Sequence, residues 1–218
     1  ADLPGIPRQY ATGFNSNDRG YLIAGVFGDG TFSNEVFEYE PSENKWSQLQ
    51  NAPFPERAKA AGFRIGDFYF FGSGRNDSVY FNDFYRFEMN TGIWTQMDSL
   101  PFSPRCEMVG ISALGLGYLL LGQNDSNTFS QVWKYDIVED SWSKSGDFPG
   151  DARTFVSAVS ESQGAIVAGG FSETGELVSQ AYYFDVWSDA WIQLDNAPLT
   201  TRGMEGFCLN NQIYFVGG

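Results

Sequence analysis

Five arginines recur along the chain at a nearly constant spacing. They lie 48 or 49 residues apart, at Arg8, Arg57, Arg105, Arg153 and Arg202. A planar guanidinium group can bind a carboxylate or sulfate through two parallel hydrogen bonds, so a ring of these groups at a channel mouth could hold an anion. Because every repeat carries the arginine, we favour a structural role, in which each side chain bonds its own connector or a neighbouring repeat.

Two charged residues stand two positions after a recurring arginine. Lys59 and Glu107 occupy the place where the other repeats have Tyr10, Phe155 and Met204. They either line a central channel or form an ion pair between neighbouring repeats. Residues that differ between repeats are better site candidates than residues that every repeat preserves. The channel candidates are Lys59, Glu107, Arg57, Arg105 and Arg153.

Histidine is absent from all 218 residues. Its absence removes the Ser–His and Cys–His nucleophile pairs and the metal sites built on imidazole. Paired carboxylates could still exchange protons with a substrate, but most stand in turns or at strand edges, where solvation explains them. The oxygen-rich loops FGDGTFSNE and QNDSN match no calcium-loop spacing. We therefore predict no catalytic residue, no metal and no cofactor.

A second residue type keeps the period of the arginines. Each repeat has a strand-like run, an apolar strand ending in glycine, a variable polar loop, an aromatic strand and a strand opened by tryptophan. Four short strands separated by Gly, Pro and Asn turns predict an antiparallel meander. Because such a sheet cannot bury both faces alone, the repeats must pack together, and radial packing gives a β-propeller. The tryptophans are Trp46, Trp94, Trp142 and Trp191.

The repeat resembles the kelch repeat, which has a diglycine after its second strand and an aromatic residue at a fixed distance before a tryptophan. The diglycine is complete at Gly169-Gly170 and Gly217-Gly218 and reduced to one glycine at Gly25, Gly72 and Gly122. Connectors such as DFPGDAR resemble those of secreted or surface kelch proteins of bacteria. The aromatic residue stands seven positions before the tryptophan, at Tyr39, Phe87, Tyr135 and Phe184.

The repeat predicts an all-β fold, a kelch-type β-propeller with four complete four-stranded blades and half of a fifth. The resemblance implies a ring of six or seven blades, so we expect residues 1–218 to form one incomplete propeller domain. Residues 1–8 have the pattern of an earlier connector. The blades are expected at residues 9–57, 58–105, 106–153 and 154–202, with the partial blade at 203–218.

The loops between strands 2 and 3 are the most variable part of the repeat. In a meander they emerge at the same end of the sheet as the connectors, and the resemblance implies that ligands bind there. The loop SGRNDSVYFND combines cationic and aromatic groups that suit a binding hot spot. The candidates at this end are Arg75, Asp77, Tyr80, Phe81, Asn124 and Asp125.

One tryptophan falls outside the period. Trp187 stands in the turn between strands 3 and 4, where the other repeats have Ser42, Asn90 and Val138. An exposed tryptophan at that turn could stack on a sugar or a protein partner, and a contact with a neighbouring domain is an equal alternative.

Composition limits the partners. The formal charge of −14 repels phosphate backbones, so we do not expect nucleic acid as a partner. No run of 18 apolar residues predicts a transmembrane helix. Cys106 and Cys208 are too few for a disulfide scaffold, and we expect two buried free thiols. The chain starts without Met, which fits either removal of a signal peptide or an excised fragment.

The leading hypothesis is a non-catalytic module that binds a protein or a glycan, located outside the cytoplasm or on a cell surface. One alternative is a glycan-active enzyme, such as a sugar mutarotase or epimerase of the kind also built on kelch propellers, which would use channel arginines and carboxylates. Another is a structural subunit of a larger surface assembly, in which the acidic surface would face a basic patch on the partner.

Overall fold

The computed structural model describes residues 1–198, 200–210 and 212–218. This part of the chain contains 22 strands and no α-helix, and hence no helix that could cross a membrane. The chain divides into two compact units, residues 1–106 and 107–218. The division falls within one residue of the predicted boundary between the second and third repeats, and the two units are described separately.

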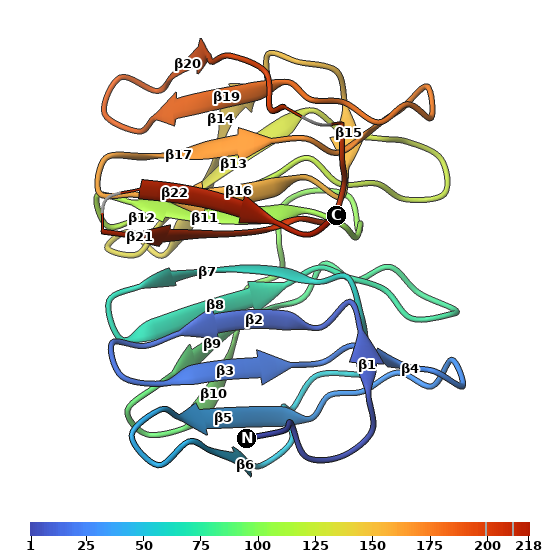
Figure 1. The fold of residues 1–218 in the computed structure, drawn as a ribbon, viewed down its shortest axis with the longest axis vertical. Helices are drawn as coiled ribbons and strands as arrows, with labels where there is room; N and C mark the ends of the chain where they lie inside the picture. The colour runs from blue at the N-terminus through green and yellow to red at the C-terminus, as the bar shows by residue number, and fades with distance from the viewer. Residues whose placement is uncertain (199, 211) are drawn as a thin grey trace. The chain divides into compact units, whose positions relative to one another are not determined.

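The first unit contains two four-stranded antiparallel sheets in which each strand pairs with the next (Figure 1). Blade 1 consists of β2 (Thr12–Asn15), β3 (Gly20–Ile23), β5 (Val36–Glu40) and β6 (Lys45–Gln48). Blade 2 consists of β7 (Ala61–Ile65), β8 (Phe68–Gly72), β9 (Phe84–Glu88) and β10 (Ile93–Met97).

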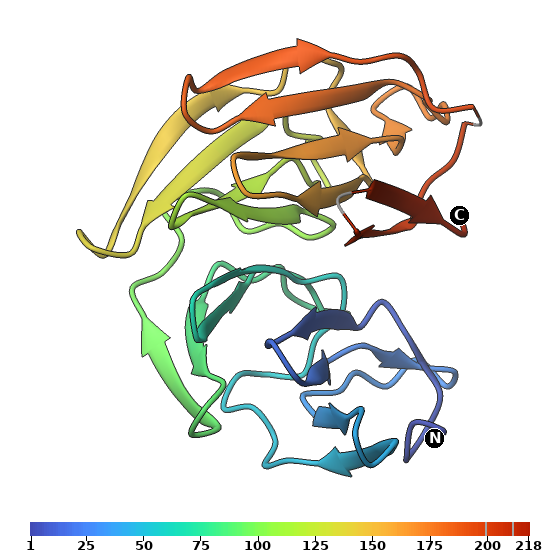
Figure 2. The same cartoon turned by 60° about the vertical axis from the view of Figure 1, so that its left-hand side comes forward.

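The second unit contains two more four-stranded meanders and one hairpin (Figure 2). Blade 3 consists of β11 (Val109–Ala113), β12 (Leu116–Leu120), β13 (Gln131–Asp136) and β14 (Ser141–Asp147). Blade 4 consists of β16 (Ser157–Ser160), β17 (Gly164–Ala168), β19 (Ala181–Asp185) and β20 (Ala190–Gln193). The hairpin, which we call the half-blade, consists of β21 (Glu205–Leu209) and β22 (Gln212–Val216).

Short ladders join the start of a blade to its own loop between strands 2 and 3. In blade 1, β1 (Arg8–Gln9) pairs with β4 (Val26–Phe27), and in blade 4, β15 (Arg153–Thr154) pairs with β18 (Phe171–Ser172). In each of these blades the first strand of the ladder begins at the recurring arginine, so the ladder ties the arginine's segment to the loop.

The four sheets are the blades of a β-propeller, which confirms the predicted fold class. The constant spacing of aromatic residue and tryptophan has a simple physical cause, because the two residues face each other across strands 3 and 4 of each blade. Tyr39 opposes Trp46 with ring centres 5.0 Å apart, and Phe184 opposes Trp191 at 4.7 Å. The tryptophans are therefore packing residues, as predicted.

Aromatic side chains also hold neighbouring blades together inside each unit. In unit 1 the ring of Phe14 stacks on Tyr69 of blade 2 at 3.7 Å, and Phe87 meets Tyr21 edge-on at 5.7 Å. In unit 2 the ring of Tyr118 in blade 3 meets Phe184 of blade 4 edge-on at 5.2 Å. The high aromatic content of the sequence thus fills the spaces between blades.

The backbone corrects the predicted position of the diglycine in blade 2. Two successive residues after strand 2 have positive φ in every blade and in the half-blade, and in blade 2 they are Ser73 and Gly74, at 61° and 90°. Gly72 is instead the last residue of β8. The second position requires glycine, because a Cβ at Gly74 would lie 2.8 Å from the carbonyl oxygen of Ala58.

The structure also corrects the fifth arginine. The amides of Gly25 and Gly74 donate to the carbonyl oxygens of Arg57 and Arg105, whereas the matching bond from Gly170 goes to Thr201, at 2.9 Å. Thr201 therefore holds the arginine position, and Arg202 is exposed one residue later. Backbone register decides this position, and a side chain of the same type one residue away misled the sequence comparison.

The same shift affects the predicted counterpart of Lys59 in the half-blade. Gly203, not Met204, takes the equivalent left-handed conformation, with φ of 65°. The cysteine prediction is right in part, since neither Cys106 nor Cys208 forms a disulfide and Cys106 is buried, but Cys208 is exposed.

Candidate functional site

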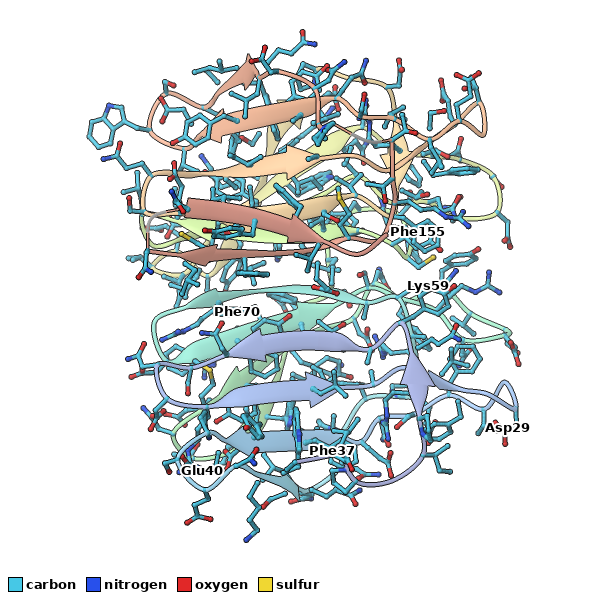
Figure 3. The ribbon with its side chains drawn as sticks, viewed as in Figure 1. Asp29, Phe37, Glu40, Lys59, Phe70 and Phe155 are labelled. Atoms are coloured by element: carbon cyan, nitrogen blue, oxygen red, sulfur yellow. The ribbon has the colours of Figure 1, made fainter. Side chains whose placement is uncertain are left out.

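Each blade has two ends that differ in composition. We call the end that carries the loop between strands 2 and 3 the loop face, and the end that carries the two tight turns the turn face. In blade 1, Asp29 marks the loop face and Glu40 the turn face (Figure 3).

The recurring arginines of blades 1 to 4 are buried beneath the loop face. The side chains of Arg57, Arg105 and Arg153 are at most 1% exposed. Arg57 donates through Nε to the carbonyl of Pro55 at 3.1 Å and through Nη1 to that of Ser73 at 3.0 Å. These bonds join its own connector to its own loop, so the geometry favours the structural interpretation.

In blades 1, 2 and 4, the same sequence position supplies a partner of the arginine. It lies just before or at the start of strand 3. Arg8 contacts Glu35 at 2.6 Å in blade 1, whereas Arg153 donates to the neutral amide oxygen of Gln180 at 2.6 Å in blade 4. Burial lowers the pKa of Arg153. The residues at this position are Glu35, Asp83, Gln131 and Gln180.

Lys59 and Glu107 both adopt the left-handed backbone conformation, with φ of 57° and 58°. Within unit 1, the ammonium of Lys59 lies 4.8 Å from the ring centre of Tyr10. Within unit 2, the buried carboxylate of Glu107 accepts a 2.7 Å hydrogen bond from Gln123. Because the two residues belong to different units, the channel and the ion pair between them remain predictions.

The blade 2 loop is built around an internal turn. The side-chain oxygen of Asn76 accepts hydrogen bonds from the amides of Ser78 and Val79, each at 3.0 Å. Arg75 lies over the ring of Tyr80, 4.9 Å from its centre, and also donates to the Tyr80 hydroxyl at 3.0 Å. The contact between Arg75 and Tyr80 joins the two sides of the loop. Asp77 is exposed at the tip of the loop.

Two other predicted loop residues, Phe81 and Asn124, make contacts that stabilise their own loops. The ring of Phe81 lies 3.9 Å from the guanidinium carbon of Arg57, beneath the loop surface. In blade 3, Asn124 accepts bonds from the amides of Ser126 and Asn127 and so repeats the turn of Asn76. Asp125, like Asp77, is exposed at the tip of its loop.

A groove opens between the loops of blades 1 and 2. It encloses about 590 Å³, within the range of small-ligand sites. Three carboxylates line it, those of Asp29, Glu56 and Asp77. None of the three forms an ion pair in the described part of the chain. The full lining of this loop-face groove is Asp29, Gly30, Thr31, Phe32, Glu56, Asn76, Asp77 and Ser78.

Local hydrogen bonds position one of these carboxylates, that of Asp29, and favour its ionised form. The amide of Thr31 donates to the carboxylate of Asp29 at 2.9 Å, and bonds from the backbone and side chain of Thr31 keep the pKa of Asp29 below its usual value. Sequence analysis identified Asp77 but missed Asp29 and Glu56. The meander topology predicted that the connectors and these loops lie at one end of the sheet, but only the folded unit decides that the connector APFPER and the loop FGDGTFSNE line the same groove.

Trp187 lies on the turn face of blade 4. Its side chain is 86% exposed, and its amide donates to the carboxylate of Asp185 at 3.0 Å. The bond fixes the turn, and the indole extends into solvent from a defined backbone.

Comparison with known proteins supports the fold and gives no further assignment. No protein-family model matches the chain, and no curated protein sequence does. The solved structure of YjhT matches it with a TM-score of 0.79 over 99% of this chain and 75% of that one, at 17% identity. At so low an identity the match shows a shared fold alone. The chain is a β-propeller protein.

Proposed function

We propose that this chain is a kelch-type module that binds a protein or glycan ligand without catalysis, and that it acts outside the cytoplasm. The observation that carries the proposal is the loop-face groove, where three carboxylates and a half-buried aromatic ring, that of Phe32, line one concave surface. Ionised carboxylates accept hydrogen bonds from hydroxyl, amide and ammonium groups, so the groove fits a ligand rich in donors.

The buried arginines favour a binding module over the mutarotase or epimerase alternative. In the form predicted from the sequence, such an enzyme would use the channel arginines, together with carboxylates, to contact its substrate. Arg57 and Arg153 are instead buried and donate hydrogen bonds to carbonyl and side-chain groups of their own blades. Kelch membership and the location outside the cytoplasm rest on the repeat pattern and on the connector resemblance.

Glycan and peptide arrays probed with the purified chain test the proposal. We expect ligands rich in donor groups to bind the chain, and the double variant Asp29→Asn, Asp77→Asn to bind them about tenfold or more weakly, as the loss of charged hydrogen bonds predicts. The matched control is Asp67→Asn with Glu43→Gln, two exposed carboxyl groups in turns.

Two results would contradict the proposal. One is equal loss of binding in the groove variant and the control, which would show that net charge alone governs binding. The other is substrate turnover that disappears with the groove carboxylates, which would make the chain an enzyme.

A further inference from the structure

The turn face of unit 1 carries a second concave site that is separate from the loop-face groove. It encloses about 370 Å³ between blades 1 and 2. Polar groups come from the turn after β2 and from β3 and β5, and the turn after β9 forms the opposite wall. Its lining is Ser16, Asp18, Arg19, Tyr21, Glu38, Leu49, Phe87, Met89, Asn90, Thr91 and Gly92, and we call it the turn-face pocket.

A fixed set of polar groups lies along one side of this pocket. Arg19 donates to Glu38 at 2.5 Å and contacts Glu40 at 2.9 Å. The hydroxyl of Tyr21, a residue only 3% exposed, donates to the other oxygen of Glu38 at 3.1 Å. These contacts hold Glu38 from two directions, so its carboxylate is positioned before any ligand arrives.

Three apolar residues also line the pocket, Leu49, Phe87 and Met89. Leu49 is the most exposed of them, whereas Phe87 is 1% exposed and packs edge-on against the ring of Tyr21. Sugar rings carry hydroxyl groups at the edge, which a carboxylate can bind, and C–H groups on the face, which apolar side chains can contact. The volume lies in the range of small-ligand sites.

Blades 3 and 4 show that the pocket is not a general consequence of the repeat. The position of Gly92 is held there by Asp189, whose carboxylate accepts a hydrogen bond from Ser145, the counterpart of Leu49. That hydrogen bond joins blade 3 to blade 4 at the position that corresponds to the turn-face pocket between blades 1 and 2. Glu38 is likewise particular to blade 1, since its register position holds Arg86 in blade 2 and Lys134 in blade 3.

From these observations we infer that the turn-face pocket binds a neutral, hydroxylated ligand of monosaccharide size. Glu38 and the Tyr21 hydroxyl would bond its hydroxyl groups, and the apolar residues would contact one ring face. The lining has one cation, Arg19, against Asp18 and Glu38, so an anionic sugar is disfavoured.

Saturation-transfer NMR with methyl α-glucoside and methyl β-galactoside at millimolar concentration tests the inference. The chain itself suggests the blocking variant, because Asn90 stands at the turn position that Trp187 occupies in blade 4. We expect saturation to pass from the unmodified chain to the glycosides, to be lost in Asn90→Trp and to be retained in the matched control Val138→Trp. Tyr21→Phe should weaken binding about fivefold, since one neutral hydrogen bond is lost.

Three results would overturn the inference: no saturation transfer to either glycoside, equal transfer from Asn90→Trp and from the unmodified chain, or tighter binding of a glucuronide than of the neutral sugars. The double variant Asp29→Asn, Asp77→Asn should leave this binding unchanged. The inference can therefore fail while the proposed loop-face function stands, and the reverse also holds.

Discussion

Arg57 and Asp83 form a bidentate ion pair beneath the loop of blade 2. Both terminal nitrogens of the guanidinium group donate to the carboxylate, and the bond from Nη2 to Oδ2 measures 2.6 Å. The arginine side chain is fully buried, whereas that of Asp83 is 19% exposed. Blade 4 replaces this pair with Arg153 and the neutral Gln180, so the chain contains both versions of one contact.

This difference between blades predicts a difference in stability. Asp83→Ala leaves a buried guanidinium group without its counter-charge, and we expect the free energy of unfolding to fall by about 3 kcal/mol. Gln180→Ala removes a neutral acceptor and should cost about 1.5 kcal/mol. Urea unfolding at neutral pH compares the two variants. A larger loss for Gln180→Ala would contradict the ion-pair account.

Ser73 offers a stabilising substitution. Its φ of 61° is left-handed, its side chain is buried, and its hydroxyl has no hydrogen-bond partner among the described residues. Ser73→Gly relieves the strain and removes the unsatisfied group, and we expect a gain of about 1–2 kcal/mol after the greater chain entropy of glycine is subtracted.

Ser73→Ala is the control for the two causes, because it removes the hydroxyl and keeps the backbone strain. Its gain in the free energy of unfolding, measured by the same denaturant titration, should be smaller than that of Ser73→Gly. An alanine variant at least as stable as the glycine variant would show that backbone strain contributes nothing at this position.

Tyr21 predicts a pH dependence in the alkaline range. Burial, reinforced by the charge of Glu38, raises the pKa of Tyr21 from 10 to about 12. The folded state thus holds the phenolic proton more tightly than the unfolded state does. The stabilising contribution is complete below pH 10 and is lost as the pH rises through about 12.

Tyrosinate absorbance measured against pH checks this assignment. Burial also raises the pKa of Tyr118 to about 12 and raises the pKa values of Tyr69, Tyr85 and Tyr183, so Tyr21 is one of several tyrosines that should contribute to the late step. Tyr21→Phe should reduce that step and leave the titration near pH 10 unchanged. Phenylalanine is a conservative choice, because Phe70 holds the same register position in blade 2. An unchanged late step would place Tyr21 among the ordinary tyrosines.

Truncation of two tryptophans should change the stability of the protein to very different extents. Trp94 meets the rings of Phe54 at 5.3 Å and Phe87 at 4.7 Å, so Trp94→Ala should lower the free energy of unfolding by about 3 kcal/mol. Trp187 is 86% exposed, and Trp187→Ala should change the free energy of unfolding by less than about 0.5 kcal/mol. Thermal unfolding of both variants provides the comparison, and similar losses would contradict it.

The repeat was predictable because it depends on residue spacings within each blade. The cross-strand pair Tyr39 and Trp46 must recur at one spacing wherever strands 3 and 4 pair through a tight turn of constant length. The strand positions, the fold class and the packing role of the tryptophans follow from that spacing. Thr201 escaped prediction because side-chain identity, and not backbone register, guided the comparison there.

Sequence alone determined an all-β chain of four meanders and a hairpin, the absence of histidine chemistry, and the loops that vary. The folded unit decided which of those residues meet. Asp29 and Asp77 stand in different repeats, yet they line one groove, and Arg19, Tyr21 and Glu38 converge with Phe87 from the next blade. Strand alternation along a sequence fixes the face on which a side chain lies. Contacts between blades depend on how whole sheets pack, and no local period records that.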